Sequence, residues 1–285
     1  MRDLINCVAI RDKIVERMKE EVATLPTAPT LAIIQVEGDK SSDVYVRNKE
    51  KLCEEVGINS IVMKLSNDTS QELLEHYVKE LSGDKDIHGV MIQLPLPKHL
   101  NAQKAIDLFS AYKDVDGLTT ISQGLVFTNQ LNEALIPCTP QGVMEIFKEM
   151  GYDLTGKNAV VVGRSQLFGN VMAQLLMRKN ATVTLCHSYT SDLKEITKRA
   201  DVVVSAIGQP LFFNEDFFED CDMAIDVGIN VVESSVGRKL YGDIDINRLG
   251  ENVKYATPTP RGTGILTVAM LLKNTIKAYH LQNKE

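Results

Sequence analysis

AVVVGRSQLFGNVMAQLL, residues 159–176, is the stretch that decides the fold of the chain's second half. Its four opening residues are apolar, as in a buried strand, and apolar residues return at helical spacing after Gly169. A strand, a turn at Gly163 and a helix direct backbone N–H groups and a helix dipole toward an anion. The middle glycine of the dinucleotide fingerprint G-x-G-x-x-G is absent, so a purely structural turn stays open as an alternative.

Strands and helices alternate along both halves of the chain. The second half predicts strands at 159–163, 182–186, 202–208, 223–228 and 253–257, with helices at 141–150, 169–179 and 191–199. Thr139 is the predicted N-cap of the first of these helices, and Pro140 is its predicted first helical residue. The first half predicts strands at 31–36, 60–65 and 89–94, with helices near 10–22, 43–56 and 71–81, the last capped by Thr69 or Ser70. This alternation predicts parallel sheets covered by helices, an α/β fold. The boundary between the halves falls between 117 and 140, and a last helix begins near 266.

Composition narrows the class of protein. A chain of 285 residues is long enough for two domains, and its net charge of −7 disfavours a general nucleic-acid role. The N-terminus lacks the features of a signal peptide, and no apolar run is long enough to cross a membrane. The five cysteines are scattered without a C-x-x-C pair and the histidines without H-E-x-x-H spacing, which argues against a metal site. We therefore expect a cytoplasmic protein without metal, membrane or nucleic-acid partners.

The residues after the 182–186 strand bear on the choice of cofactor. NAD-binding domains place a carboxylate there for the ribose 2′-hydroxyl, whereas this chain has His187, Ser188 and Tyr189. Arg164 could reach the same space, and a guanidinium with hydroxyl and imidazole donors suits a 2′-phosphate. NADP is therefore favoured over NAD, although NAD remains possible and Arg164 could be only a solvated turn residue.

Polar residues in the first half form a second candidate site. Tyr45 and Lys49 are four residues apart and share one face of a predicted helix, at the margin of a buried stripe formed by Val44, Leu52 and Val56. Gln93 closes one strand and Asp116 lies in a loop beyond another. Ligands gather beyond the carboxyl ends of parallel strands, so these side chains could converge. A Tyr–Lys pair on a helix surface is the plainer alternative.

Taken together, the motifs resemble the bifunctional methylenetetrahydrofolate dehydrogenase/methenyltetrahydrofolate cyclohydrolase family over nearly the whole chain. The matching motifs are Y-V-x-x-K at 45–49, QLPLP at 93–97, KDVDG at 113–117, PCTP at 137–140, G-R-S-x-x-x-G at 163–169, IDVGIN at 225–230 and GD at 242–243. The resemblance implies oxidation of 5,10-methylenetetrahydrofolate with NADP, followed by hydrolysis of the methenyl product to 10-formyltetrahydrofolate. A non-catalytic binding protein, and an NADP oxidoreductase of another small acid such as a shikimate-type enzyme, are the alternatives.

The resemblance also implies domains and roles. It gives an N-terminal parallel-sheet α/β catalytic domain at 1–138, onto which the C-terminal helix 266–285 packs back, and a C-terminal Rossmann-like NAD(P)-binding domain at 139–265, in a homodimer. Lys49 would be the catalytic lysine, with Gln93 tuning it, Tyr45 stacking on the folate ring system and Asp116 holding the pterin. The other expected substrate residues are Leu94, Pro95, Pro260 and Gly262. The expected cofactor residues are Gly163, Arg164, Ser165, Gly169, His187, Ser188, Gly228, Ile229, Gly264 and Thr267.

The loop ATPTPRGTGILT, residues 256–267, departs from the family's usual TPVPGGVGPMT. Arg261, Thr263, Ile265 and Leu266 stand where the family has glycine, valine, proline and methionine, and Phe168 and Val171 stand where it has valine and proline. These departures cluster on the nicotinamide side, whereas the lysine side keeps its motifs. We therefore expect water addition to be retained and hydride transfer to be slowed or its cofactor preference altered. Neutral variation in a tolerant loop is the alternative.

Overall fold

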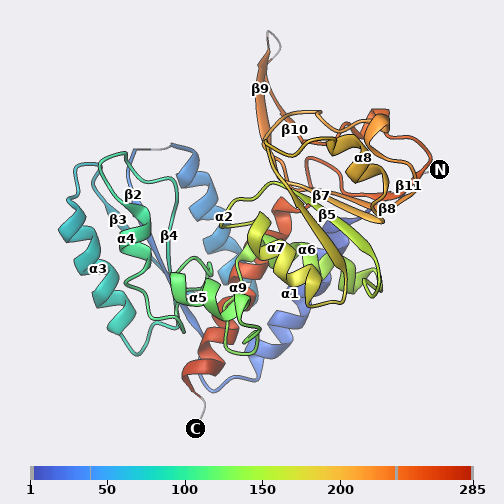
Figure 1. Ribbon diagram of the computed structural model, residues 1–285. Helices are drawn as coiled ribbons and strands as arrows, with labels where there is room; N and C mark the ends of the chain where they lie inside the picture. The colour runs from blue at the N-terminus through green and yellow to red at the C-terminus, as the bar shows by residue number, and fades with distance from the viewer. Residues whose placement is uncertain (1–2, 39, 235–236, 284–285) are drawn as a thin grey trace. The chain divides into compact units, whose positions relative to one another are not determined.

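The computed structural model describes residues 3–38, 40–234 and 237–283, and the chain divides into two compact units (Figure 1). The N-terminal unit comprises Lys13–Cys138 and Val268–Glu285, and the C-terminal unit comprises Met1–Asp12 and Thr139–Thr267. The start of the chain joins the C-terminal unit because strand β1 (Asp3–Leu4) pairs in parallel with β11 (Val253–Ala256). Both units are α/β, as the sequence pattern predicts.

The N-terminal unit is built on a three-stranded parallel sheet in the order β3 (Asn59–Leu65), β2 (Thr30–Val36), β4 (Gly89–Ile92). Its helices are α2 (Lys40–Val56), α3 (Gln71–Gly83), α4 (Ala102–Ile106), α5 (Thr120–Phe127) and most of α1 (Cys7–Ala23) and α9 (Gly264–Gln282). The central strand β2 is buried from Leu31 to Val36, as expected for a continuous apolar run covered on both faces.

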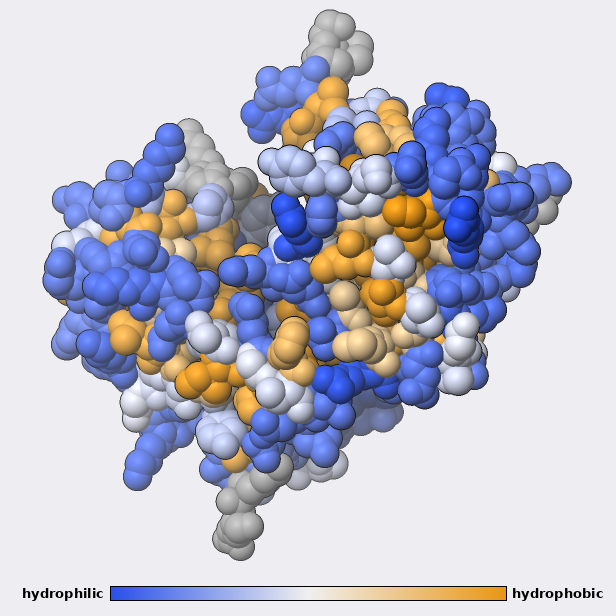
Figure 2. All heavy atoms as spheres, in the orientation of Figure 1, coloured by the Kyte–Doolittle hydropathy of each residue, from blue (hydrophilic) through white to orange (hydrophobic). Residues whose placement is uncertain are grey.

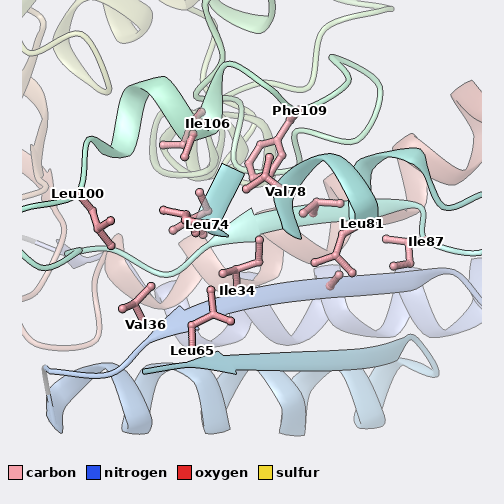
Figure 3. Packing of buried hydrophobic residues seen from close by; sticks show 14 residues of the cluster. Ile34, Val36, Leu65, Leu74, Val78, Leu81, Ile87, Leu100, Ile106 and Phe109 are labelled. Carbon is pink, nitrogen blue, oxygen red and sulfur yellow. The ribbon is translucent and has the colours of Figure 1, made fainter. Parts of the chain in front are cut away.

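Apolar side chains join this sheet to the helix that covers one of its faces. Ile34 and Val36 of β2 and Leu65 of β3 point toward Leu74, Val78 and Leu81 of α3 (Figure 3). The apolar positions of α3 recur at three- and four-residue spacing, so they lie on one face of the helix. Helix α3 begins at Ser70, whose hydroxyl accepts a hydrogen bond from the N–H of Leu73 at 3.2 Å; of the two predicted caps, Ser70 is therefore the one used.

The C-terminal unit is a six-stranded parallel sheet in the order β1-β11-β8-β7-β5-β6. Its remaining strands are β5 (Asn158–Val162), β6 (Thr182–Cys186), β7 (Val202–Ser205) and β8 (Cys221–Asp226). Its remaining helices are α6 (Cys138–Glu149), α7 (Gly169–Met177) and α8 (Leu193–Lys198), with 3₁₀ turns η1 (Glu215–Phe217) and η2 (Ile246–Arg248). From β5 the chain moves first to β6 on one side and then to β7 on the other. The carboxyl ends of β5 and β7 therefore form the topological switch point, where such sheets bind ligands.

An antiparallel hairpin of β9 (Asn230–Ser234) and β10 (Gly237–Tyr241) extends from this unit (Figure 1). Figure 2 shows apolar side chains among hydrophilic ones on the hairpin, where Val231 and Leu240 are 58% and 41% exposed. The sequence pattern did not predict the hairpin, because its strands carry charged and apolar residues without a clear alternation.

Some boundaries of helices and strands differ from the predicted ones. Helix α6 begins at Cys138, so Thr139 is not its N-cap, and strand β4 ends at Ile92 rather than at residue 94. Helix α9 begins at Gly264, two residues before the predicted start; residues 284–285 of the predicted 266–285 helix lie outside the described part of the chain. Within that described part, no helix combines the length and apolar character needed to cross a bilayer.

Candidate active site

Helix α2 carries Lys49 in line with its buried face. Val46 and Cys53 are 2% and 0% exposed, and Lys49 lies three residues after the first and four before the second, on the same face of the helix. Val44, predicted to belong to the buried stripe, is 56% exposed, so that part of the prediction is wrong. Lys49 is consequently half-buried within the apolar stripe, not at its margin.

The Lys49 ammonium meets the amide of Gln93 directly. Lys49 Nζ donates a hydrogen bond to Gln93 Oε1 at 2.6 Å, and Gln93 Nε2 donates to the carbonyl oxygen of Leu94 at 2.7 Å. The second bond fixes which end of the amide faces the lysine. Gln93 is 8% exposed and directly follows β4, where its own N–H binds the carbonyl of Ile34 at 2.8 Å. The edge of the sheet therefore holds the acceptor rigidly in front of Lys49.

Burial lowers the pKa of Lys49, because the ammonium form loses its hydration. The negative charge of Asp116 acts in the opposite direction and does not reverse the shift. Gln93 is neutral, so its hydrogen bond positions the amine without the stabilisation that a carboxylate would give to the ammonium. The site thus favours an uncharged amine at a lower pH than an ordinary lysine would.

Asp116 lies within electrostatic range of Lys49 and beside a thiol. Burial raises the pKa of Asp116, whereas the Lys49 charge and a hydrogen bond from Cys138 oppose that rise. Cys138 Sγ also lies 3.4 Å from the carbonyl oxygen of Val115. Gly117, with a φ of +69°, packs so closely that a Cβ there would lie 2.5 Å from the carbonyl oxygen of Leu135. The KDVDG loop is thereby fixed against the segment that leads to Cys138.

Helix α9 also holds the KDVDG loop and the segment that leads to Cys138. Asn274 is fully buried, and its Nδ2 donates to the carbonyl oxygens of Val115 and Ile136, both at 2.8 Å. The spacing of residues in the sequence gives no role to Cys138 or to Asn274. The PCTP motif was the available signal for Cys138, whereas a single asparagine in a long helix gave no signal.

The structure brings Lys49, Gln93 and Asp116 together in the N-terminal unit, which also contains Tyr45, Leu94 and Pro95. Tyr45 is one helical turn before Lys49 on α2 and is 55% exposed. Leu94 is half-buried against the apolar cluster, and Pro95 is exposed. The ring of Tyr45 is therefore available for stacking on a flat ligand.

In the C-terminal unit, glycines shape the turn after β5. Gly163 has a φ of +119°, and a Cβ on it would overlap the carbonyl oxygen of Ala206, in the loop after β7. A Cβ on Gly169 would overlap the carbonyl oxygen of Gly163. Helix α7 begins just after Phe168, which makes no side-chain cap hydrogen bond. Its first N–H groups thus lie at the switch point, in the arrangement that binds phosphate.

Basic and aromatic side chains follow the carboxyl ends of β5 and β6. The guanidinium of exposed Arg164 lies over the ring of Tyr189, 5.8 Å from its centroid. The N–H of Tyr189 donates to His187 Nδ1 at 3.2 Å, which leaves Nε2 as the protonated ring nitrogen of the neutral imidazole. Ser165 and Ser188 are exposed beside these residues in the sequence. The donors expected to bind a 2′-phosphate therefore follow the ends of two paired strands, β5 and β6.

Of the remaining expected cofactor residues, Gly228 and Ile229 lie in the loop after β8, and Gly264 and Thr267 lie in the first turn of α9. Gly228 is buried, and its N–H donates to Asp226 Oδ1 at 2.9 Å, whereas Ile229 is 57% exposed. A Cβ on Gly264 would lie 3.1 Å from Ile229 Cδ1. Thr267 Oγ1 lies 3.3 Å from the hydroxyl of Thr139.

The divergent loop 256–267 keeps a tight backbone despite its substitutions. Arg261 is exposed and has a φ of +69°, a conformation that costs a non-glycine residue about 1–2 kcal/mol. Pro260 is exposed, and a Cβ on Gly262 would overlap the carbonyl oxygen of Pro258. Thr263 is 4% exposed and donates to the carbonyl oxygen of Asp226 at 2.9 Å. One departure from the family pattern therefore strains the loop, and another ties it to β8.

The cysteines and the possible metal ligands of the described residues add no further candidate site. The five cysteines are free and buried, and burial raises the pKa of Cys138 well above its usual range. In the described residues, no group of three or more His, Cys, Asp or Glu side chains is placed to hold a metal ion.

Comparison with known proteins gives full-length matches. Residues 5–116 match the tetrahydrofolate dehydrogenase/cyclohydrolase catalytic domain, and residues 137–283 match the NAD(P)-binding domain of the same name. The bifunctional protein FolD of Campylobacter hominis is 43% identical over 278 residues, 96% of each chain. Among solved structures, the Campylobacter jejuni FolD methylenetetrahydrofolate dehydrogenase/cyclohydrolase is 36% identical with a TM-score of 0.92, covering 98% of each chain. The Trypanosoma brucei enzyme, solved with NADP cofactor and an inhibitor, is 34% identical with a TM-score of 0.90, covering 98% of this chain and 97% of its own.

Proposed function

The chain belongs to the tetrahydrofolate dehydrogenase/cyclohydrolase family, and we propose how its residues carry the two reactions of a bifunctional enzyme. In the first reaction, 5,10-methylenetetrahydrofolate is oxidised by NADP to 5,10-methenyltetrahydrofolate. In the second, water adds to the methenyl carbon and the ring opens to 10-formyltetrahydrofolate. The candidate acid/base residues lie in the N-terminal unit, and the candidate cofactor residues lie in the C-terminal unit.

Lys49 is the acid/base of the water-addition step. The observation that carries this role is the 2.6 Å hydrogen bond between Lys49 Nζ and Gln93 Oε1, together with burial that lowers the pKa of Lys49. An uncharged amine accepts a proton from the attacking water and returns it as the ring opens. An ordinary lysine, with a pKa of about 10.4, is protonated at neutral pH and cannot act as a base.

The folate is held around this pair. Asp116 accepts hydrogen bonds from the amide-like edge of the pterin, and Tyr45 stacks on the flat ring system. Leu94 and Pro95 contribute apolar surface next to Gln93. Pro260 and Gly262, in the divergent loop, complete the set of substrate residues.

NADP binds at the carboxyl edge of the C-terminal sheet. When bound, the cofactor accepts a hydride from the methylene carbon. The turn residues Gly163, Ser165 and Gly169 hold phosphate through backbone and hydroxyl donors, and Arg164, His187 and Ser188 hold the 2′-phosphate. Gly228, Ile229, Gly264 and Thr267 lie along the rest of the cofactor. The guanidinium of Arg164, held over Tyr189, is the feature that favours NADP over NAD.

We further propose that the protein is a cytoplasmic homodimer. The five free, buried thiols suit a reducing compartment, and a homodimer is what the family resemblance implies. Sedimentation of the purified protein tests the second statement, since a monomer at micromolar concentration would contradict it.

The function is tested by assaying the two steps separately on the purified protein. NADP reduction in the presence of methylenetetrahydrofolate reports the first step, and the decay of methenyltetrahydrofolate absorbance without NADP reports the second. We expect both activities, with NADP used better than NAD. Absence of both would refute the assignment.

A cyclohydrolase-dominant enzyme is the second candidate, and the strained Arg261 favours it. The same pair of assays decides between the two, because a weak first step beside a full second step would identify it. Full dehydrogenase turnover with ordinary NADP affinity would instead show that the loop tolerates its substitutions.

A further inference from the structure

Two buried carboxylates in the C-terminal unit have no part in the chemistry described above. Asp226 closes β8 and is 1% exposed, and Asp243 follows the hairpin and is fully buried. Such groups are retained in a protein interior only when hydrogen bonds replace their lost hydration. Their partners therefore indicate what they hold in place.

Asp243 accepts hydrogen bonds from two segments of the chain, one at and after the end of β7 and one at the start of β9. Its Oδ2 accepts from the hydroxyl of Ser205 at 2.9 Å and the N–H of Ile207 at 2.7 Å. Its Oδ1 accepts from the N–H of Gln209 at 2.9 Å and from Asn230 Nδ2 at 3.0 Å. Ser205 closes β7, Ile207 and Gln209 lie in the loop after it, and Asn230 opens β9. One side chain thus sets the course of the backbone from 205 to 209.

Asp226 holds Asp243 in turn. Asp226 Oδ1 accepts from the N–H of Gly228 at 2.9 Å and from the N–H of Asp243 at 3.0 Å, and its Oδ2 accepts from the N–H of Ile244 at 2.8 Å. Burial raises the pKa of Asp226 to about 7, and the nearby Asp243 adds to the rise while these backbone donors oppose it. The two carboxylates therefore form one connected network.

Two glycines leave the space that the carboxylates occupy. A Cβ on Gly228 would overlap the carboxyl group of Asp243, and a Cβ on Gly242 would overlap Asp226 Oδ2. Neither glycine has a positive φ among the described glycines, so close approach to a carboxylate, not an unusual backbone conformation, accounts for both. The structure thus explains why glycine stands in the IDVGIN and GD motifs, which the sequence alone did not show.

The loop held by Asp243 is also the loop that packs against the phosphate-binding turn. Ala206 lies within it, and its carbonyl oxygen occupies the place that a Cβ on Gly163 would take. Gly228, on the other side of Asp243, is itself an expected cofactor residue. Asp243 is therefore the group that connects the turn after β5 to the loops after β7 and β8.

We propose that Asp243 is the positioning residue of the NADP site: it does not touch the cofactor, but it fixes the backbone that does. This inference rests on the proposed function and adds to it a residue outside both sets of ligand contacts. A carboxylate suits this place because each of its oxygens accepts from a backbone N–H, that of Ile207 or that of Gln209. An asparagine would turn an NH₂ group toward one of these N–H groups and would leave that donor unsatisfied.

The test is Asp243→Asn, with Asp245→Asn as matched control. Asp245 caps η2, where its side chain accepts a hydrogen bond from the N–H of Asn247 at 3.2 Å. Its substitution should therefore not affect the 205–209 loop. We expect the KM for NADP to rise about tenfold or more in Asp243→Asn. The KM for methylenetetrahydrofolate and the NADP-independent hydrolysis of methenyltetrahydrofolate should stay within about twofold of the unmodified protein. A purely structural role would instead reduce the active fraction, and hence the maximal rate, at every NADP concentration.

A milder variant keeps the inference testable if Asp243→Asn fails to fold. Ser205→Ala removes one donor and leaves the carboxylate with three, and should raise the KM for NADP about threefold. An unchanged NADP KM in folded Asp243→Asn, or an equal loss in Asp245→Asn, would overturn the inference. If the unmodified protein bound NADP but did not oxidise methylenetetrahydrofolate, the proposed function would fail, and calorimetric NADP binding by the same variants would still decide the role of Asp243.

Discussion

The lysine site and the cofactor site are built in different ways. In the N-terminal unit, side chains act on side chains: Lys49 donates to Gln93, and the charge of Lys49 opposes the rise in the pKa of Asp116. In the C-terminal unit, the cofactor edge is mainly backbone, shaped by glycines such as Gly163 and held from behind by a buried carboxylate. Moving a proton depends on the identity of a side chain, whereas holding a dinucleotide depends largely on the course of the backbone.

The divergent loop shows what this difference permits. Arg261 stands where the family pattern has glycine and has a φ of +69°, a backbone conformation that favours glycine. Thr263 adds a hydrogen bond to Asp226, which helps to anchor the loop. A site defined by backbone can therefore accept new side chains at the cost of strain, whereas we expect the lysine site to accept none.

The largest effect should come from the lysine itself. Lys49→Met removes the proposed base and should lower the rate of methenyl hydrolysis at least about 100-fold, while folate binding, measured by calorimetry, remains. Lys51→Met is the control, because Lys51 lies on the exposed side of the same helix. If Lys49→Met still hydrolysed methenyltetrahydrofolate at the full rate, Lys49 would not be the base. The lysine site would then not depend on the identity of its side chain.

The next largest effect concerns backbone shape. Gly163→Ala forces alanine to a φ of +119° and against the carbonyl oxygen of Ala206, so the KM for NADP should rise about tenfold or more. Gly156→Ala is the control, since Gly156 has a φ of +75° and nothing within 4 Å of its Cβ position. It should cost about 1–2 kcal/mol of stability and leave NADP binding unchanged. Equal NADP binding by both variants would mean that the turn does not shape the cofactor site.

The pH dependence of the hydrolysis rate tests whether the lysine site depends on the pKa of its side chain. The lowered pKa of Lys49 makes the neutral amine available as pH rises, earlier than in an ordinary lysine. Gln93→Glu places a carboxylate against the ammonium, which should raise that pKa and move the rising limb of the hydrolysis rate to higher pH. Gln93→Met removes the hydrogen bond without adding charge and should not move the limb upward. Identical profiles for the two variants would exclude a titrating Lys49.

The smallest effect is expected in the divergent loop. Arg261→Gly relieves the positive φ and should stabilise the protein by about 1 kcal/mol, less the added freedom of glycine in the unfolded chain. If the strain slows hydride transfer, the ratio of dehydrogenase to cyclohydrolase rates should rise by a few-fold. Thermal melting and the paired assays measure the two effects. An unchanged ratio would assign the substitutions to neutral variation.

The sequence predicted the parallel sheets and the convergence of Lys49, Gln93 and Asp116, because strand ends in such sheets share an edge. It did not place Lys49 in the buried stripe, since Val44 seemed the better apolar candidate and only packing shows that Val46 and Cys53 are the buried pair. It also missed the hairpin, whose strands lack a clear alternation of apolar and polar residues. The contacts of Asn274 and Asp243 were missed for another reason: they join segments far apart in the chain, as in the bond from Asn274 to Val115, and no local pattern encodes them.

The overlap between glycines and carboxylates constrains how this sequence can evolve. Gly228→Ala should be damaging while Asp243 is present and far milder once that side chain is shortened, and Gly242 should depend on Asp226 in the same way. Each pair should therefore show strong epistasis in a combinatorial library, with neither partner free to drift alone.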